Sequence, residues 1–149
     1  MILFLDFDGV LHPIEAEGAE LFSCLQQLWT LLRRHPEIDV VFSTAWRSRL
    51  SLNTLREYVT MDGGEDLAPR FIAATTDKID HDSDLESRLI ECESWLAENA
   101  REQDPWIAID DMAGLFGHKP AANVYIVNSA HGLREHDVEA ISALIRRLS

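Results

Sequence analysis

Short apolar runs alternate with longer amphipathic stretches along this chain. Apolar runs too short for helices predict buried strands at residues 2–5, 39–44, 71–74, 106–109 and 124–127. The stretches between them predict helices at residues 19–35, 50–59 and 84–101, and a last helix follows the turn at Gly132. This alternation predicts an α/β fold with a doubly wound, mainly parallel five-stranded sheet and helices on both faces.

The first strand ends in two carboxylates that are separated by one residue. Residues i and i+2 of an extended chain project to the same side, so Asp6 and Asp8 should face one site while Phe7 turns toward the core. Gly9 then allows a sharp turn. Two like charges beside an apolar strand repel each other and are costly to bury, and a divalent metal ion is the simplest compensation.

Polar residues also close two later strands. Ser43 and Thr44 end the second strand, and Asp110 and Asp111 end the fourth. In an open parallel sheet the ligand site lies outside the carboxyl ends of the strands. The sequence therefore predicts that these pairs converge with Asp6 and Asp8 at one edge of the sheet.

Length and composition narrow the class of protein. A chain of 149 residues with 46% apolar residues fits one domain, residues 1–149, with a sizeable core. No apolar run approaches the roughly 20 residues that span a bilayer. The early Asp6 also argues against a secretory signal, so we expect a cytoplasmic protein without a membrane partner. Cys24 and Cys92 lie far apart, without the spacing of a zinc site, and are expected to be buried thiols.

The net charge is strongly negative. Twenty-six acidic and 13 basic residues give a formal charge of −13. This charge argues against strong general binding to DNA or RNA, while a local basic patch is compatible with it.

The motifs at the strand ends resemble those of a known family. Residues 6–10, Asp-Phe-Asp-Gly-Val, resemble the first signature of the haloacid dehalogenase (HAD) superfamily, whose members are mostly phosphatases that use an aspartate nucleophile and magnesium. Ser43 resembles the second signature, and residues 107–111 resemble the fourth. Over its whole length the chain is similar to a compact branch of this superfamily, a HAD domain found alone or attached to RNA-repair proteins. This resemblance implies a Rossmann-like core with a minimal cap.

The resemblance also implies roles for the acidic residues. Asp6 would attack phosphorus and form an aspartyl-phosphate, and Asp8 would protonate the leaving oxygen and later deprotonate water. Mg²⁺ would bind Asp6, Asp110 and the main-chain carbonyl of Asp8. Asp111 would bind the metal through water or orient its ligands.

Hydroxyl and cationic residues complete the expected site. Either Ser43 or Thr44 would hydrogen-bond the phosphoryl oxygens, with Ser43 favoured because it closes the apolar run. The third signature is a Lys or Arg that offsets negative charge; Arg88 fits by position, and Lys78 is its competitor. Two further residues are candidates for substrate contact, and each could equally be an ordinary surface or loop residue: Arg47, which could bind a phosphate bidentately, and His12.

These features together predict a magnesium-dependent phosphohydrolase that acts on a phosphomonoester. The intervals between the signatures are too short for a folded cap, so the open site would suit a nucleotide or an RNA or DNA end as well as small phosphoesters. The alternatives are a catalytically weak HAD-like module that binds partners or phosphorylated ligands, a phosphoacceptor signalling domain and a metal-dependent nuclease. The filled acidic and hydroxyl positions favour an enzyme.

Overall fold

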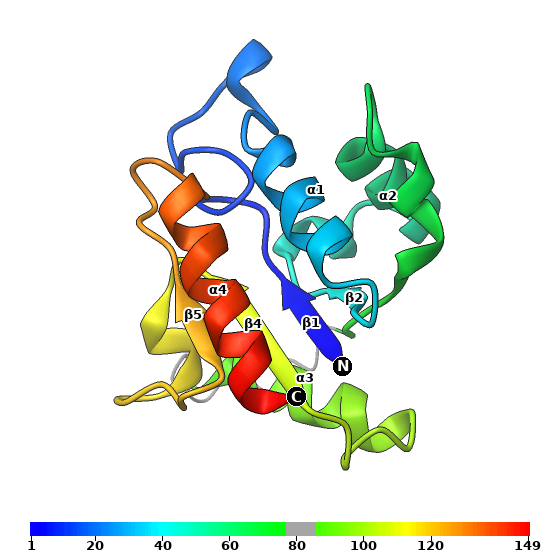
Figure 1. Ribbon diagram of the computed structural model, residues 1–149, viewed down its shortest axis with the longest axis vertical. Helices are drawn as coiled ribbons and strands as arrows, with labels where there is room; N and C mark the ends of the chain where they lie inside the picture. The colour runs from blue at the N-terminus through cyan, green and yellow to red at the C-terminus, as the bar shows by residue number, and fades with distance from the viewer. Residues whose placement is uncertain (77–85) are drawn as a thin grey trace.

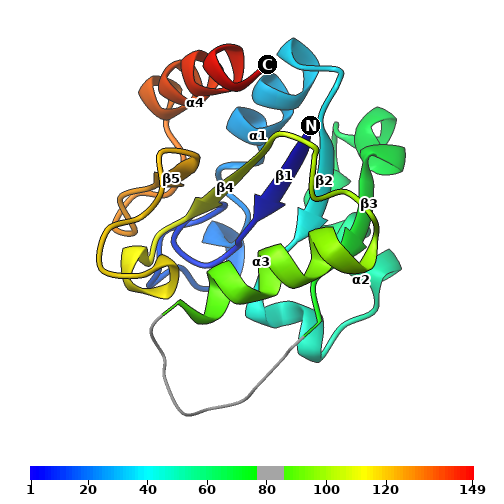
Figure 2. The same cartoon turned by 90° about the horizontal axis from the view of Figure 1, so that it is seen from below.

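A five-stranded parallel sheet forms the centre of the molecule (Figure 1). Its strands lie in the order β3-β2-β1-β4-β5 (Figure 2). The computed structural model describes residues 1–76 and 86–149. The strands are β1 (Ile2–Leu5), β2 (Asp39–Phe42), β3 (Phe71–Ala74), β4 (Trp106–Asp110) and β5 (Val124–Ile126). The chain builds the sheet outward from β1 to β3 and then returns to place β4 on the other side of β1. The predicted doubly wound sheet is thus confirmed, with β1 at its centre.

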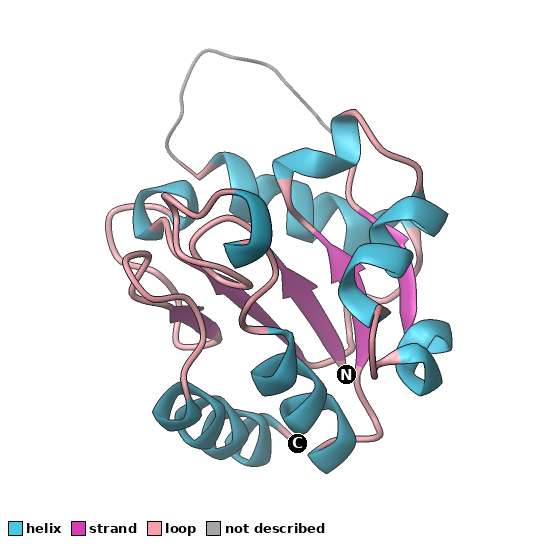
Figure 3. Ribbon diagram, turned by 90° about the horizontal axis from the view of Figure 1, so that it is seen from above, coloured by secondary structure: helices cyan, strands magenta, loops and turns pink. Residues whose placement is uncertain are grey.

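Helices cover both faces of the sheet (Figures 2 and 3). The helices are α1 (Leu25–Arg34), α2 (Leu52–Thr60), α3 (Ser87–Glu98) and α4 (Glu135–Leu148). Residues of α1, α2 and α4 share one hydrophobic core, whereas α3 contributes to a second core on the opposite face. No helix in the described ranges is long and apolar enough to cross a membrane.

The alternation of side chains along β1 supplies both cores. Leu3 and Leu5 belong to the core beneath α1 and α4, while Ile2 and Phe4 pack with Cys92 and Trp95 on the α3 side. All four residues of β1 are fully buried. A strand covered on both faces must be apolar throughout, which explains the uninterrupted run that precedes Asp6.

The first helix is shorter than its apolar pattern predicts. Residues 19–35 were expected to be helical, but Gly18–Glu20 form a 3-10 turn, η1, and α1 begins only at Leu25. Phe22 lies between them with a φ of 59°, a left-handed conformation that an α-helix excludes. The predicted start of the third helix and Lys78 fall within residues 77–85, outside the described ranges.

The segments between the first three strands contain no cap domain. Residues 6–38 and 43–70 are described throughout, and their regular structure consists of η1, α1, η2 (Ala45–Ser48), α2 and η3 (Glu65–Arg70). The carboxyl ends of the strands are therefore not covered by an inserted domain from these two segments. Cys24 and Cys92 are both buried and unpaired, as expected.

Candidate active site

The parallel register brings the predicted acidic residues together. Leu5 pairs with Ile109, and the Asp6 N–H donates to the Ile109 carbonyl at 3.1 Å, so Asp6 and Asp110 leave neighbouring strands side by side. Oxygens of Asp6, Asp110 and Asp111 all lie within 4.8 Å of one another. We call these three residues the carboxylate cluster. Asp6 lies more than 100 residues from the Asp110–Asp111 pair in sequence, and the pairing of β1 with β4 brings the two segments together.

The second strand adds its hydroxyl residues beside this cluster. The Ser43 N–H donates to the Leu5 carbonyl at 2.9 Å, which places Ser43 next to the end of β1. Ser43 and Thr44 are both buried. The Thr44 hydroxyl accepts the Trp46 N–H at 3.3 Å and caps η2, whereas Ser43 directly follows the apolar strand.

Arg88 reaches the carboxylate cluster from the first turn of α3. Its Nη1 lies 3.7 Å from Asp6 Oδ1 and 3.8 Å from Asp110 Oδ2. Glu91, one turn further along the helix, lies 3.8 Å from Arg88 Nε. Sequence reasoning overlooked Glu91, although its i,i+3 spacing from Arg88 was a signal that the two could pair. Arg88 thus lies beside two carboxylates of the cluster, and its role as the site cation stays a prediction.

Burial and mutual repulsion make the carboxylate cluster hard to ionise. Burial raises the pKa of Asp6 to about 8; the charge of Asp110 adds to this increase and Arg88 opposes it. Burial likewise raises the pKa of Asp110 to about 6, with Arg88 again opposing. The pKa of Asp111 is also raised, chiefly by burial. One guanidinium therefore does not fully compensate the three carboxylates, of which Asp6 and Asp110 are buried and Asp111 is half-buried.

The donor set of the carboxylate cluster fits a hard divalent cation. Asp110 is 1% exposed, and its Oδ1 accepts the Met112 N–H at 2.9 Å. Its Oδ2 is buried and accepts no hydrogen bond from the described residues. Carboxylate oxygens are the ligands that Mg²⁺ prefers, and a cation bound there would supply the missing charge and the missing partner of Oδ2.

Asp8 lies in a different environment from Asp6. Its side chain is 45% exposed, and two donors hold its carboxylate: His12 Nε2 at 2.9 Å from Oδ1 and Trp46 Nε1 at 3.0 Å from Oδ2. His12 Nδ1 accepts the Phe22 N–H at 3.2 Å. Because that nitrogen accepts, the proton of a neutral imidazole lies on Nε2 and points at Asp8. The left-handed conformation of Phe22 is thus part of the support for Asp8.

Two predicted substrate contacts occupy other places in the structure. His12 is 1% exposed, and both ring nitrogens are engaged as described. Arg47 donates from Nε to the Thr75 carbonyl at 2.9 Å and from Nη1 to the Thr44 carbonyl at 2.6 Å, and its Nη2 lies 2.8 Å from Glu91. Arg47 therefore ties the end of β2 to β3 and α3. Direct contact of either residue with substrate stays a prediction.

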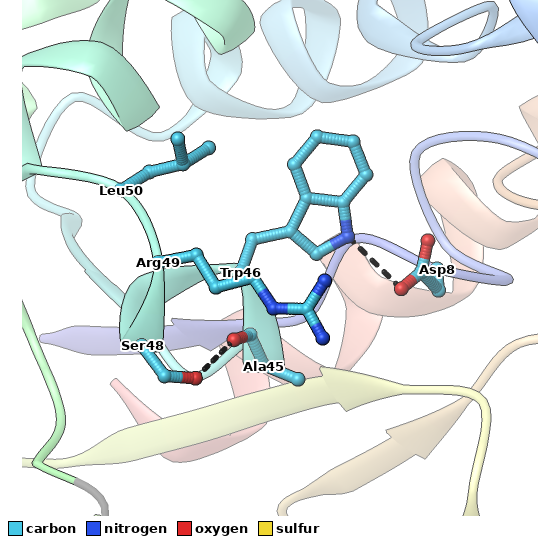
Figure 4. A pocket seen from close by; sticks show the side chains of 6 residues that line it. All are labelled: Asp8, Ala45, Trp46, Ser48, Arg49 and Leu50. Carbon is cyan, nitrogen blue, oxygen red and sulfur yellow. Dashed lines mark hydrogen bonds between the residues drawn. The ribbon is translucent and has the colours of Figure 1, made fainter.

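A pocket of about 420 Å³ opens beside Asp8 (Figure 4). Its lining residues are Asp8, Ala45, Trp46, Ser48, Arg49 and Leu50. Sequence reasoning gave no role to Trp46 or Arg49. Trp46 lies in η2 and Arg49 directly follows η2. Their position shortly after the predicted end of β2 was the available signal, because loops at this edge of a parallel sheet line its ligand site.

The fold and the site together define a class of protein. A Rossmann-like parallel sheet with Asp-x-Asp after its central strand, a hydroxyl after one neighbour and an acidic pair after the other is the arrangement of a HAD domain. Comparison with protein families matches residues 2–138 to the family described as "HAD domain in Swiss Army Knife RNA repair proteins". The chain belongs to this family, and its HAD domain suggests a hydrolase of the phosphatase type. Comparisons with curated proteins and with solved structures find no match.

Gly9→Ala should disrupt the carboxylate cluster. Gly9 has a φ of 74°, and an added Cβ would overlap the Asp111 carboxylate. We expect a loss of stability of about 1–3 kcal/mol together with weaker magnesium binding. Gly18→Ala is the matched control, because Gly18 has a φ of 55° but an added Cβ meets no atom within 4 Å. Magnesium affinity would be measured by calorimetry. Equal effects of the two substitutions would show that a Cβ at residue 9 does not disturb the Asp111 carboxylate.

The metal-free protein should lose stability as the pH rises. The pKa of Asp6 is about 8 in the folded protein against 3.8 for an unperturbed Asp carboxyl, so the folded state binds the proton more tightly than the unfolded state. The free energy of unfolding therefore falls as the pH rises from about 4 to about 8. We expect thermal unfolding in a chelator to show this slope, and Asp6→Asn to reduce it.

The control for this experiment is Asp66→Asn. Asp66 is an exposed carboxyl whose pKa is lowered by Arg33, so it is ionised in both states between about pH 5 and pH 8 and should leave the slope unchanged. An identical slope in wild type and Asp6→Asn would show that the cluster does not titrate in this range.

Proposed function

We propose that this protein is a magnesium-dependent phosphohydrolase that cleaves a phosphomonoester through an aspartyl-phosphate on Asp6. The main observation behind this proposal is the carboxylate cluster, in which a buried Asp110 oxygen lacks a hydrogen-bond partner among the described residues. Asp8 lies next to this cluster in the chain and lines a pocket. Membership of the HAD family supports the same reaction class. We further propose that residues 1–149 act as one domain; a cytoplasmic location stays a prediction.

The contrast between Asp6 and Asp8 supports different chemical roles. Asp6 is buried in the cluster and is suited to attack phosphorus, forming a P–O bond as the bond to the leaving oxygen breaks. Asp8 is half-exposed at the pocket and is suited to give its proton to that oxygen. In the second step Asp8 takes a proton from water, which attacks phosphorus and releases phosphate and free Asp6.

Several residues would manage the negative charge of this reaction. Asp6, Asp110 and Asp111, with the main-chain carbonyl of Asp8, would hold Mg²⁺, and Arg88 lies beside two of these carboxylates. Magnesium held by these residues would supply positive charge that offsets the carboxylates and the phosphoryl group. Ser43 is suited to donate its hydroxyl to a phosphoryl oxygen, because it directly follows the apolar strand and its N–H donates to the Leu5 carbonyl at the end of β1.

The substrate class is proposed from the open site and the family. The segments between the first three strands insert no cap over the strand ends, so a polymer end could approach them. The matched family is described as a domain of RNA-repair proteins. We therefore place a phosphorylated nucleotide or nucleic-acid end first among the substrates and small phosphoesters second.

Phosphate release should depend on magnesium and on Asp6. We expect the wild-type protein to release phosphate from at least one member of a panel containing an aryl phosphate, mononucleotides and RNA with a terminal phosphate. Asp6→Asn should lower kcat by a factor on the order of 10³ or more, because the nucleophile is lost. Asp8→Asn should lower it by about 10²–10⁴.

Asp66→Asn serves as the control, since it makes the same chemical change at an exposed carboxylate paired with Arg33. If no substrate is hydrolysed while magnesium still binds to the cluster, the catalytically weak binding module becomes the better interpretation.

Trp46→Phe should impair the positioning of Asp8. The substitution keeps an aromatic ring and removes the indole N–H that lies 3.0 Å from Asp8 Oδ2. We expect kcat to fall about tenfold for an alkyl phosphate, whose leaving oxygen needs a proton, and less for an aryl phosphate with an acidic leaving group. The measurement is the ratio of the two kcat values.

Trp29→Phe provides the comparison. It removes an equivalent indole hydrogen bond, to the Val59 carbonyl at 2.8 Å, in the core beneath α1. It should lower stability and leave the ratio unchanged. A Trp46→Phe protein with an unchanged ratio would show that the indole N–H does not serve Asp8.

A further inference from the structure

We propose that the pocket beside Asp8 is a leaving-group subsite that binds a nucleotide carrying a second phosphate, with Arg49 holding that phosphate. This inference rests on the proposed function, because it assigns the reacting phosphomonoester to the carboxylate cluster. It adds the chemical nature of the group that departs.

The location of the pocket assigns it to the leaving group. Asp8 lines the pocket and is the proposed proton donor to the leaving oxygen, so the departing part of the substrate must lie on this side of the site. The pocket has a volume of about 420 Å³. Pockets that bind small molecules measure about 300–1,000 Å³, so this one holds a group of nucleoside size rather than a phosphate alone.

Arg49 gives the pocket an available cation. Arg49 is exposed, and its guanidinium makes no hydrogen bond or ion pair with the described residues. In Figure 4 the guanidinium points toward Asp8 across the pocket. The planar fork of Arg matches two oxygens of a phosphate.

The other two arginines near the site lie in different environments. Arg47 donates to main-chain carbonyls, and Arg88 lies among the carboxylates of the cluster. In a chain with a net charge of −13, an anionic substituent needs a local cation to remain bound. Arg49 is placed to be that cation.

The remaining wall of the pocket favours a ring. Trp46 is fixed by its hydrogen bond to Asp8 and by edge contacts with Phe7 and Phe22, with ring centroids 5.6 and 5.3 Å away. Leu50 lies beside it along the pocket. A pre-organised apolar wall next to an arginine fits a base or sugar ring that carries a phosphate. The two sources of this chemistry are a free nucleoside bisphosphate and the phosphorylated end of a nucleic acid.

The test measures binding without turnover. In the Asp6→Asn background, calorimetry would compare adenosine 3′,5′-bisphosphate with the 3′- and 5′-monophosphates, with ribose bisphosphate and with a dinucleotide bearing a terminal phosphate. We expect the bisphosphate to bind more tightly than either monophosphate. Arg49→Gln should reduce that preference by about ten- to a hundredfold, the loss typical of a charge-assisted hydrogen bond.

Arg33→Gln is the control for charge, because it removes an exposed guanidinium that pairs with Asp66, outside the pocket. It should leave the preference intact. An equal preference in the Arg49→Gln protein would overturn the role of Arg49, and equal affinity for adenosine and ribose bisphosphates would overturn the nucleotide assignment. Tighter binding of the dinucleotide than of the bisphosphate would identify a nucleic-acid end as the source.

These outcomes are distinct from failure of the proposed function. Phosphate release by the wild-type protein together with an unchanged preference in Arg49→Gln would retain the phosphatase and reject the subsite. A lost preference without any phosphate release would retain Arg49 as the phosphate-binding residue of a nucleotide pocket, but it would reject the phosphatase and with it the leaving-group role of the pocket.

Discussion

Repulsion among buried carboxylates is the constraint on which the site depends. Asp6, Asp110 and Asp111 would separate if their backbones could move, but Asp6 and Asp110 are fixed by the hydrogen bonds between β1 and β4. The sheet is anchored in turn by cores on both of its faces, so the free energy of packing maintains an unfavourable charge arrangement. The negative charge of the ionised cluster is therefore only partly compensated by Arg88, and a bound cation would stabilise it further.

The two aspartates of one short motif acquire different properties because their surroundings differ. Asp6 is held among other acids, whereas Asp8 is half-exposed and accepts hydrogen bonds from two N–H donors. The support of Asp8 extends through His12 to the left-handed backbone of Phe22. The same backbone feature that delays the start of α1 therefore also fixes the tautomer of His12. Local strain and the positioning of Asp8 are two aspects of one arrangement.

The fold and the acidic part of the site could be predicted because each follows from local patterns. Buried strands are apolar, and parallel strands place their carboxyl ends at one edge, so Asp6, Ser43 and Asp110 had to meet. The engagement of Arg47 and His12 could not be predicted in this way. Whether an arginine contacts carbonyls or solvent depends on the exact path of β3 and α3, which lie far from Arg47 in sequence. The shortened α1 has a different, local cause, because apolar spacing does not report a single residue with positive φ such as Phe22.

The three arginines near the site have different electrostatic environments: Arg88 and Arg47 contact groups of the protein, and Arg49 lies at the surface. Arg88 offsets carboxylates that belong to the protein, and Arg47 joins structural elements through carbonyls and Glu91. If either guanidinium moved away, its buried partners would lose a hydrogen bond or an ion pair, which is energetically costly. The Arg49 guanidinium makes no such contact with the described residues, and it lines the same pocket as Asp8. If the proposed function and subsite hold, this separation would let one cation recognise the substrate while another stabilises the reacting group in an acidic protein.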